Sequence, residues 1–536
     1  MNRKEIILKY ALQNAVKYDH AEFKAVVSKV FSELKDVKDR KVLFEEVKNV
    51  ISEVNDMKMG ERVSKLMSID PKLLEDKKEE KRELHELLNV GKNVVMRFAP
   101  NPNGAMSLGH SRQAILNWLY CEKYNGKYLL RFDDTDPKVK VPLKEAYDWF
   151  EEDLKWLGIK PWKVVRQSSR LKIYYKHAWE LFKNKKAYVC VCDSEKKRKL
   201  LWKGKKCGCE ENYDFEKFFE MKEGQGVVRI KTDLKNKNPA VRDWPAFRIV
   251  DKSEHPFEKK ERVWPLLNFA SAIDDHDFGI THIIRGIDLS VSDDRQKYLY
   301  EHFGWKYPET IYTGKLNVKG VKSTSQTKEL IKSGKLKGWD DIRTGNLKSL
   351  RRRGFQADAI VNFIKDLGLN RNEVNVDLDN LYAYNRRLVE KSNRYFFIED
   401  PKKIKIKDAP KMDVKIPLHP DNEKKGYREF KTSDEFYVQD KLEKDKMYRF
   451  MHLFNFANNK FISKDLDEKL KAKLIHWLPA EGNIKVEVLM DDGKIKKGLA
   501  ESGVKKLKAG DVVQFERNFF CCLQNKENFV FWYLHR

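Results

Sequence analysis

A glycine-bearing turn between an apolar run and a helical pattern constrains this chain more than any other feature. Residues 94–98 are apolar except for Arg97, residues 100–104 form a Pro/Asn/Gly loop, and Gly109 and His110 open an amphipathic segment that ends before a second, mostly apolar run at 127–132. This order predicts a strand, a tight turn, a helix and a parallel strand. The free N–H groups and positive dipole end of that helix would favour a phosphate.

Gly109 and His110 are therefore candidate phosphate-site residues. A glycine lets a ligand approach the backbone closely, and an imidazole can donate a hydrogen bond to a phosphate oxygen. On spacing alone, an ordinary α/β turn with a surface histidine explains this pattern equally well.

Longer segments resemble one known family. RFAPNPNG (97–104), SLGH (107–110) and RFDDTDP (131–137) are similar to the opening of a glutamyl-tRNA synthetase, a class I aminoacyl-tRNA synthetase. The likeness continues in the family's order through five further segments, at 263–288, 323–328, 338–355, 380–401 and 512–520. It covers nearly the whole chain and is strongest to the archaeal and eukaryotic form, whose C-terminal half is β-rich.

This resemblance implies a multidomain α/β and β protein. We expect a Rossmann-like class I catalytic domain at 89–330, with an inserted acceptor-binding domain at about 185–260. A helical domain precedes it at 1–88, a helical connecting domain follows at 331–400, and antiparallel β-barrels that bind the anticodon occupy 401–536. The short alternating apolar stretches after residue 401 independently predict antiparallel strands.

The first 88 residues carry apolar side chains at helical spacing among many lysines and glutamates. We expect amphipathic helices that contact transfer RNA or a protein partner. A helical cap packed on the catalytic domain is an equal alternative.

The charge of the chain indicates a polyanionic partner. Its 536 residues carry a formal net charge of +26, which suits RNA, although a general lysine bias would produce the same excess. No apolar run approaches the roughly 20 residues of a membrane span, and seven cysteines in so long a chain do not suggest a disulfide framework. We expect a cytoplasmic protein without membrane contact.

The family resemblance implies a two-step reaction. ATP, accompanied by Mg²⁺, activates L-glutamate as glutamyl-adenylate, and the glutamyl group is then transferred to the 3′ end of tRNA-Glu. Whether tRNA-Gln is also charged stays open. The alternatives are a glutaminyl-tRNA synthetase, which shares the C-terminal barrels, and a tRNA-binding paralogue with reduced activation activity.

The amino-acid pocket must satisfy two carboxylates and one ammonium group. By family position, Arg97 and Arg285 grip the carboxylates, Asp133 pairs with the ammonium, and Ala99 and Asn101 line the same pocket. Arginine suits the first task because its planar fork matches a carboxylate. Arg285 is the main reason to expect glutamate rather than glutamine.

The family's mobile signature loop matches residues 321–328, VKSTSQTK. Its catalytic candidates are Lys322, Ser323, Ser325 and Lys328, and either lysine could neutralise the pyrophosphate. The chain departs from the family pattern at four positions, Ser107, Leu267, Thr324 and Gln326. The paralogue alternative rests on Ser107, Thr324 and Gln326.

The run Arg351, Arg352 and Arg353 is a candidate tRNA-phosphate contact, because arginines neutralise phosphates. An exposed basic helix end explains the run equally well.

Four cysteines form two C-x-C pairs. Cys190 and Cys192 are separated from Cys207 and Cys209 by the 14 residues 193–206. This arrangement suits a structural Zn²⁺ with four thiolate ligands, which would stabilise a small insertion. Four reduced structural cysteines without a metal are the alternative.

Overall fold

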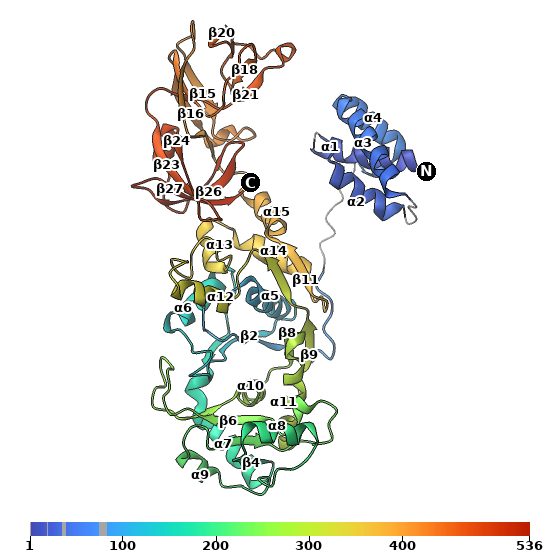
Figure 1. Ribbon diagram of the computed structural model, residues 1–536, viewed down its shortest axis with the longest axis vertical. Coiled ribbons are helices and arrows are strands. Elements are labelled where there is room, and N and C mark those ends of the chain that lie inside the picture. Colours follow the sequence, from blue (N-terminus) through green and yellow to red (C-terminus); the bar gives the residue numbers. More distant parts are fainter. Residues whose placement is uncertain (1, 19, 35–38, 74–82) are drawn as a thin grey trace. The chain divides into compact units, whose positions relative to one another are not determined.

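The computed structural model describes four stretches of the chain, residues 2–18, 20–34, 39–73 and 83–536. It divides into two units, Met1–Glu83 and Leu84–Arg536, a few residues before the predicted limit at 88. The first unit is helical, as predicted (Figure 1). Its helices are α1 (Arg3–Tyr18), α2 (Phe23–Glu33), α3 (Arg40–Asp56), α4 (Met59–Ile69) and the 3₁₀ turn η1 (Pro71–Leu73). They bury an aliphatic core that includes Ile7, Val47 and Val50.

The second unit begins with a parallel sheet that positions the candidate site. Strand β1 is hydrogen-bonded to β2 and β2 to β3, while β8 pairs with β9. The Thr281 N–H donates to the Val95 carbonyl at 2.9 Å and joins the two groups, which gives the spatial order β3-β2-β1-β8-β9. These strands are β1 (Val95–Phe98), β2 (Lys127–Phe132), β3 (Lys163–Arg166), β8 (His282–Gly286) and β9 (Glu309–Thr313). In a sheet of this order, the connections that follow β1 and β8 leave in opposite directions. Ligands bind in the crevice between such a pair of strands, at their carboxyl ends.

Helices follow the strands in the alternating order that the sequence predicts. They are α5 (Leu108–Lys123), α6 (Lys144–Trp156), α7 (Leu171–Lys183), α10 (Leu267–Asp277) and α11 (Ser290–Phe303). Helix α5 buries Leu108, Ile115 and Leu116 against the sheet core.

An antiparallel sheet interrupts the parallel one. Its strands are β4 (Ala187–Cys190), β5 (Val227–Ile230), β6 (Pro245–Ile249) and β7 (Val263–Pro265), with helices α8 (Ser194–Trp202) and α9 (Phe215–Glu220) between the first two. Its aromatic core contains Tyr174, Phe215, Trp244 and Phe247. The predicted insertion at about 185–260 falls on this sheet, and its acceptor-binding role stays a prediction.

A helical connector follows. It holds a parallel strand pair and four helices: β10 (Leu316–Lys319), α12 (Thr324–Lys332), α13 (Leu347–Arg353), α14 (Ala357–Leu367), β11 (Val374–Asp377) and α15 (Leu378–Val389). None of the described helices is long and apolar enough to cross a membrane.

The remainder is β-rich, as predicted. The larger sheet has the order β12 (Arg394–Tyr395), β25 (Val512–Phe515), β26 (Phe519–Asn525), β27 (Val530–His535), β23 (Ile484–Leu489), β24 (Ile495–Ala500) and β13 (Phe397–Glu399). Its two edge strands are consecutive in the chain, so the sheet curls toward closure. The smaller sheets use β14 (Lys402–Lys405), β15 (Asp413–Pro417), β16 (Tyr427–Lys431), β17 (Glu435–Val438), β18 (Met447–Phe450), β19 (Asn455–Ala457), β20 (Lys460–Ser463), β21 (Lys473–Ile475) and β22 (Leu478–Pro479).

Candidate active site

Buried charges meet at the carboxyl ends of β1, β2 and β8. Arg97 on β1 contacts Asp275 of α10, with 3.2 Å between Nε and Oδ1. Arg131 on β2 bridges two acids, because its Nη1 lies 2.6 Å from Asp275 and its Nε lies 2.7 Å from Asp133. The structure therefore brings together two predicted site residues, Arg97 and Asp133, through a carboxylate and an arginine that the sequence did not single out.

The electrostatics of this cluster follow from burial and pairing. Burial would raise the pKa of Asp275, but the guanidinium groups of Arg97 and Arg131 outweigh it and hold that pKa below its usual value. Burial raises the pKa of Asp133, and Arg131 offsets this only in part. A cationic group beside Asp133 would favour its ionised form.

The loop after β1 closes over Asp133. The Asn101 amide donates to the Asp133 carbonyl at 3.0 Å, and the Asp133 N–H donates to the Pro100 carbonyl at 2.9 Å. The Asn101 Oδ1 atom is buried and accepts no hydrogen bond from the described residues. Ala99 is half-buried in this loop. Leu267, at the start of α10, is 45% exposed, and its apolar side chain supplies no polar contact there.

Arg285 lies near the end of β8 and is buried. Its Nη1 atom contacts Asp293 of α11 and donates to Gln296 Oε1 at 3.3 Å. Its Nε atom is buried and donates to none of the described residues. One edge of the guanidinium is thus held by the protein, and Nε, on another edge, has no partner in the described part of the chain.

The N-terminus of α5 carries Gly109 and His110. Ser107 caps this helix, since its hydroxyl accepts the His110 N–H at 3.2 Å. Burial lowers the pKa of His110, so its ring is neutral at pH 7, and its Nδ1 has no partner among the described residues. A Cβ added at Gly109 would meet nothing closer than the Ser107 hydroxyl at 3.6 Å, so space remains beside this backbone.

The loop at 321–328, which matches the family's mobile signature, lies against the loop after β1. A Cβ added at Gly104 would lie 2.4 Å from the Trp339 ring and 2.6 Å from the Thr324 methyl, so only glycine fits there. Lys322 Nζ donates to the Arg343 carbonyl at 3.0 Å. Ser325 is exposed and Lys328 is half-buried on α12.

Gln326 and Ser107, two of the departures from the family pattern, have local structural roles. Ser323 caps α12 and accepts the Gln326 N–H at 3.3 Å, while the Gln326 side chain accepts the Ser323 N–H at 3.0 Å. This is a capping box, and the spacing Ser-x-x-Gln in the sequence could have predicted it. Ser107 is likewise a helix cap.

The contacts of the three arginines on α13 agree only in part with the prediction that they bind tRNA phosphates. Arg351 contacts Glu152 of α6 at 3.1 Å, and Arg352 contacts Asp340 at 2.6 Å and lies over the Trp532 ring. Arg353 is 1% exposed and donates to the carbonyls of Tyr533 at 3.0 Å and Leu534 at 2.5 Å. The prediction that Arg353 contacts a phosphate is wrong, because its guanidinium is enclosed by the last strand; Arg351 and Arg352 remain candidates.

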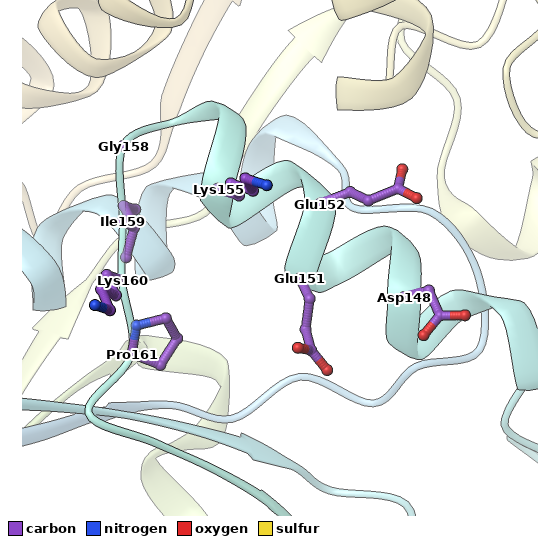
Figure 2. Close-up of a pocket in the computed structure, with 8 residues that line it drawn as sticks. All are labelled: Asp148, Glu151, Glu152, Lys155, Gly158, Ile159, Lys160 and Pro161. Carbon is purple, nitrogen blue, oxygen red and sulfur yellow. The ribbon is translucent and has the colours of Figure 1, made fainter.

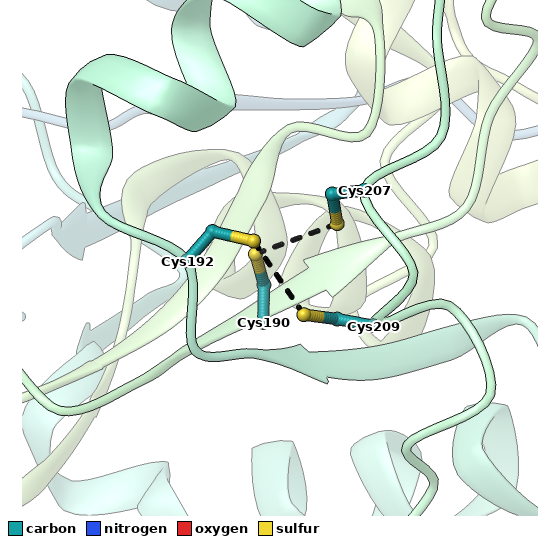
Figure 3. Close-up of side chains that lie close together, drawn as sticks. All are labelled: Cys190, Cys192, Cys207 and Cys209. Carbon is teal, nitrogen blue, oxygen red and sulfur yellow. Dashed lines mark hydrogen bonds between the residues drawn. The ribbon is translucent and has the colours of Figure 1, made fainter.

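The four clustered cysteines converge (Figure 3). Their Sγ atoms all lie within 4.8 Å of one another, with 4.0 Å between Cys190 and Cys207 and 3.6 Å between Cys192 and Cys209. None of them forms a disulfide. Tetrahedral Zn–S bonds of about 2.3 Å place sulfurs about 3.8 Å apart, so these donors fit Zn²⁺. Glu210 holds the loop by accepting the N–H groups of Cys207 and Gly208, each at 2.8 Å.

A separate hollow of about 590 Å³ lies beside α6 (Figure 2). Its lining comes from that helix and the turn after it, namely Asp148, Glu151, Glu152, Lys155, Gly158, Ile159, Lys160 and Pro161. The hollow contains no sequence-predicted site residue, and its acidic side chains do not suit a phosphate. The arginine-lined cluster between β1 and β8 is the better candidate site.

Sequence reasoning missed several residues of this cluster. Ser271 donates to Asp133 Oδ2 at 3.1 Å, and Asp293 and Asp275 hold the two predicted arginines. The available signal was the adjacent pair Asp274 and Asp275, which directly follows the mostly apolar stretch 269–273 of α10, where buried charges need partners.

Comparison with known proteins gives matches along both halves of the second unit. The description "tRNA synthetases class I (E and Q), catalytic domain" matches residues 93–394, and "tRNA synthetases class I (E and Q), anti-codon binding domain" matches 392–476 and, as a second such domain, 474–524. Two similar curated proteins are named glutamate–tRNA ligase. That of Pyrococcus furiosus is 44% identical over 98% of both chains, and that of Methanocaldococcus jannaschii is 43% identical over 99% of this chain and 100% of its own.

Proposed function

The chain belongs to the class I tRNA synthetases of the E and Q type, and from that premise we propose that it is a glutamate–tRNA ligase. It forms glutamyl-adenylate from ATP and L-glutamate and transfers the glutamyl group to the 3′ end of tRNA-Glu. The single observation that best supports an acidic substrate is the buried Arg285, whose Nε donates to no residue that the structure describes.

The pocket residues divide the recognition of glutamate. Arg97 and Arg285 bind the two carboxylates through the guanidinium donors that Asp275 and Asp293 leave open. Asp133 accepts hydrogen bonds from the ammonium group, which restores the ionised form that burial disfavours. Ala99 and Asn101 close the loop over these groups.

Activation requires no protein nucleophile, so the remaining residues position and neutralise phosphates. The neutral His110 ring and the first N–H groups of α5 donate to phosphate oxygens, and Gly109 leaves room for them. Ser323, Ser325, Lys322 and Lys328 belong to the loop over the pyrophosphate. Lys322 must release the Arg343 carbonyl to reach it. Mg²⁺, when bound with ATP, would neutralise further phosphate charge.

Pyrophosphate exchange with each amino acid tests this function. In the presence of tRNA, exchange with glutamate and little with glutamine is expected. Exchange with glutamine alone would identify a glutaminyl-tRNA synthetase, and no exchange with either would support the tRNA-binding paralogue. The paralogue alternative is weakened because Ser107 and Gln326 serve as helix-capping residues. Charging of purified tRNA-Glu and tRNA-Gln then defines the tRNA substrate.

We also propose that Cys190, Cys192, Cys207 and Cys209 hold one structural Zn²⁺. All four ligands are thiolates of the protein, so no coordination position is left for water. Metal analysis of protein purified without chelator should give about one zinc per chain, and Cys207→Ser should lower zinc content and destabilise the insertion more than it slows pyrophosphate exchange. Cys121→Ser, outside the cluster, should retain zinc. A folded, active protein with almost no zinc would reject the site.

A further inference from the structure

A buried carboxylate lies beside Arg285. Asp293, in the first turn of α11, is 1% exposed and contacts the Arg285 Nη1 atom. Two phenol groups complete its surroundings: the Tyr307 hydroxyl lies 3.0 Å from Oδ1, and the Tyr312 hydroxyl donates to Oδ2. Because no cationic residue other than Arg285 is within ion-pair distance of Asp293 in the described chain, the pair is specific.

Neighbouring elements fix this carboxylate in place. Tyr312 is the register partner of Arg285 across β8 and β9, so its hydroxyl and the guanidinium come from adjacent strands. Gln296, one turn further along α11, accepts from Arg285 Nη1 at 3.3 Å and donates to the Asn268 carbonyl of α10 at 3.4 Å. The network of contacts around Arg285 therefore includes residues of two strands, β8 and β9, and of two helices, α10 and α11.

This arrangement decides how the guanidinium is presented. Asp293 and Gln296 occupy Nη1, whereas Nε is buried and has no partner among the residues described. A guanidinium carries five N–H donors in a fixed plane, so fixing one nitrogen also fixes the direction of the others. Without the carboxylate, the long side chain would sample several rotamers.

We propose that Asp293 is a positioning residue for substrate selection: it holds Arg285 so that the free edge of the guanidinium faces the side-chain carboxylate of glutamate. This inference rests on the proposed function. Asp293 itself does not touch the substrate, so its effect must pass entirely through Arg285.

A double-mutant cycle tests the proposal in the full-length enzyme. Asp293→Ala should raise KM for glutamate about 10- to 100-fold with kcat changed far less, because a misdirected contact weakens binding. Asp293→Asn keeps an oxygen acceptor for Nη1 and should stay within about threefold of the parent. Asp294→Ala, which alters the exposed neighbour, is the matched control and should match the parent.

The decisive comparison uses Arg285→Ala. Once the arginine is absent, adding Asp293→Ala should change kcat/KM for glutamate no further, since coupled residues are not additive. Additive effects, or a parental KM in a folded Asp293→Ala enzyme, would overturn the proposal. Tyr312→Phe is a milder second variant, for which a KM rise of about threefold for glutamate but not for glutamine is expected; an unchanged KM would also count against it. A parent enzyme that ignores glutamate would instead overturn the proposed function.

Discussion

The pocket arginines (Arg97, Arg131 and Arg285) and the connector arginines (351–353) both include buried guanidinium groups, but their partners differ. Carboxylates hold the pocket arginines, and the Nε atom of Arg285 has no partner within the described stretches of the chain. In the connector, Arg353 donates to two backbone carbonyls and to the Tyr382 hydroxyl at 3.2 Å.

This difference shows that burial alone does not make an arginine a ligand-binding residue. Two carbonyls and a hydroxyl accept hydrogen bonds from the Nε and Nη2 atoms of Arg353, which fastens α13 to the last strand, and the Asp491 carboxylate lies 3.6 Å from Nη2. The Asp293 carboxylate and the Gln296 amide oxygen hold Arg285 at Nη1, and Nε donates to none of the described residues, so an anion could approach there. Arg353 and Arg285 therefore differ in the nitrogens that their hydrogen-bond acceptors occupy, which are Nε and Nη2 in Arg353 and Nη1 in Arg285.

The largest expected effect on stability comes from Arg353→Ala. It would leave the carbonyls of Tyr533 and Leu534 without their donor, and each buried acceptor left unpaired costs about 1–3 kcal/mol. Urea unfolding followed by tryptophan fluorescence measures the loss. Arg352→Ala, on the exposed side of the same helix, should cost less than about 1 kcal/mol. Equal costs would show that the buried contacts of Arg353 contribute no more to stability than the exposed contacts of Arg352.

A smaller, pH-dependent effect is expected beside Arg351. Burial raises the pKa of Asp153 to about 7, and Arg351, 3.7 Å away, offsets this only in part. An acid whose pKa is higher in the folded state destabilises the fold as pH rises from about 4 to about 7. Asp153→Asn should therefore add about 2–4 kcal/mol of stability at pH 8 and almost none at pH 4.

Urea unfolding of this variant at both pH values provides the check. Glu152→Gln, which changes the exposed acid next to it, should show little pH dependence. A gain from Asp153→Asn that is the same at both pH values would show that the Asp153 carboxylate is not responsible.

The smallest expected effect concerns tRNA affinity. If Arg351 and Arg352 contact phosphates, replacing either with alanine should reduce the slope of log affinity against log salt by about 0.7–0.9. Arg353→Ala should leave the slope unchanged, because its guanidinium is enclosed. Filter binding of tRNA-Glu over a range of salt measures the slopes. A reduced slope for Arg353→Ala would instead show that Arg353 also contacts a phosphate.

The sequence predicted the strand–turn–helix unit, the β-rich end and the convergence of Arg97 and Asp133, because local patterns and family position fix these features. It could not predict the burial of Arg353, whose carbonyl partners lie 180 and 181 residues further along the chain. Asp275 was missed for the same reason, since Arg97 lies 178 residues before it. Gln326 is a different case. The local Ser-x-x-Gln spacing is enough to predict its capping box, but the family comparison indicates only that this residue departs from the usual pattern.

One measurement tests the central claim most directly: kcat/KM for glutamate and for glutamine in the parent enzyme and in Arg285→Ala. Glutamine would place an amide donor against a guanidinium that has only donors, so the parent should prefer glutamate. Loss of the charged contact should cost glutamate on the order of 10²–10³ in kcat/KM and affect glutamine much less. Asp133→Ala, the control, should impair both amino acids alike. An unchanged glutamate-to-glutamine ratio in Arg285→Ala would contradict the account.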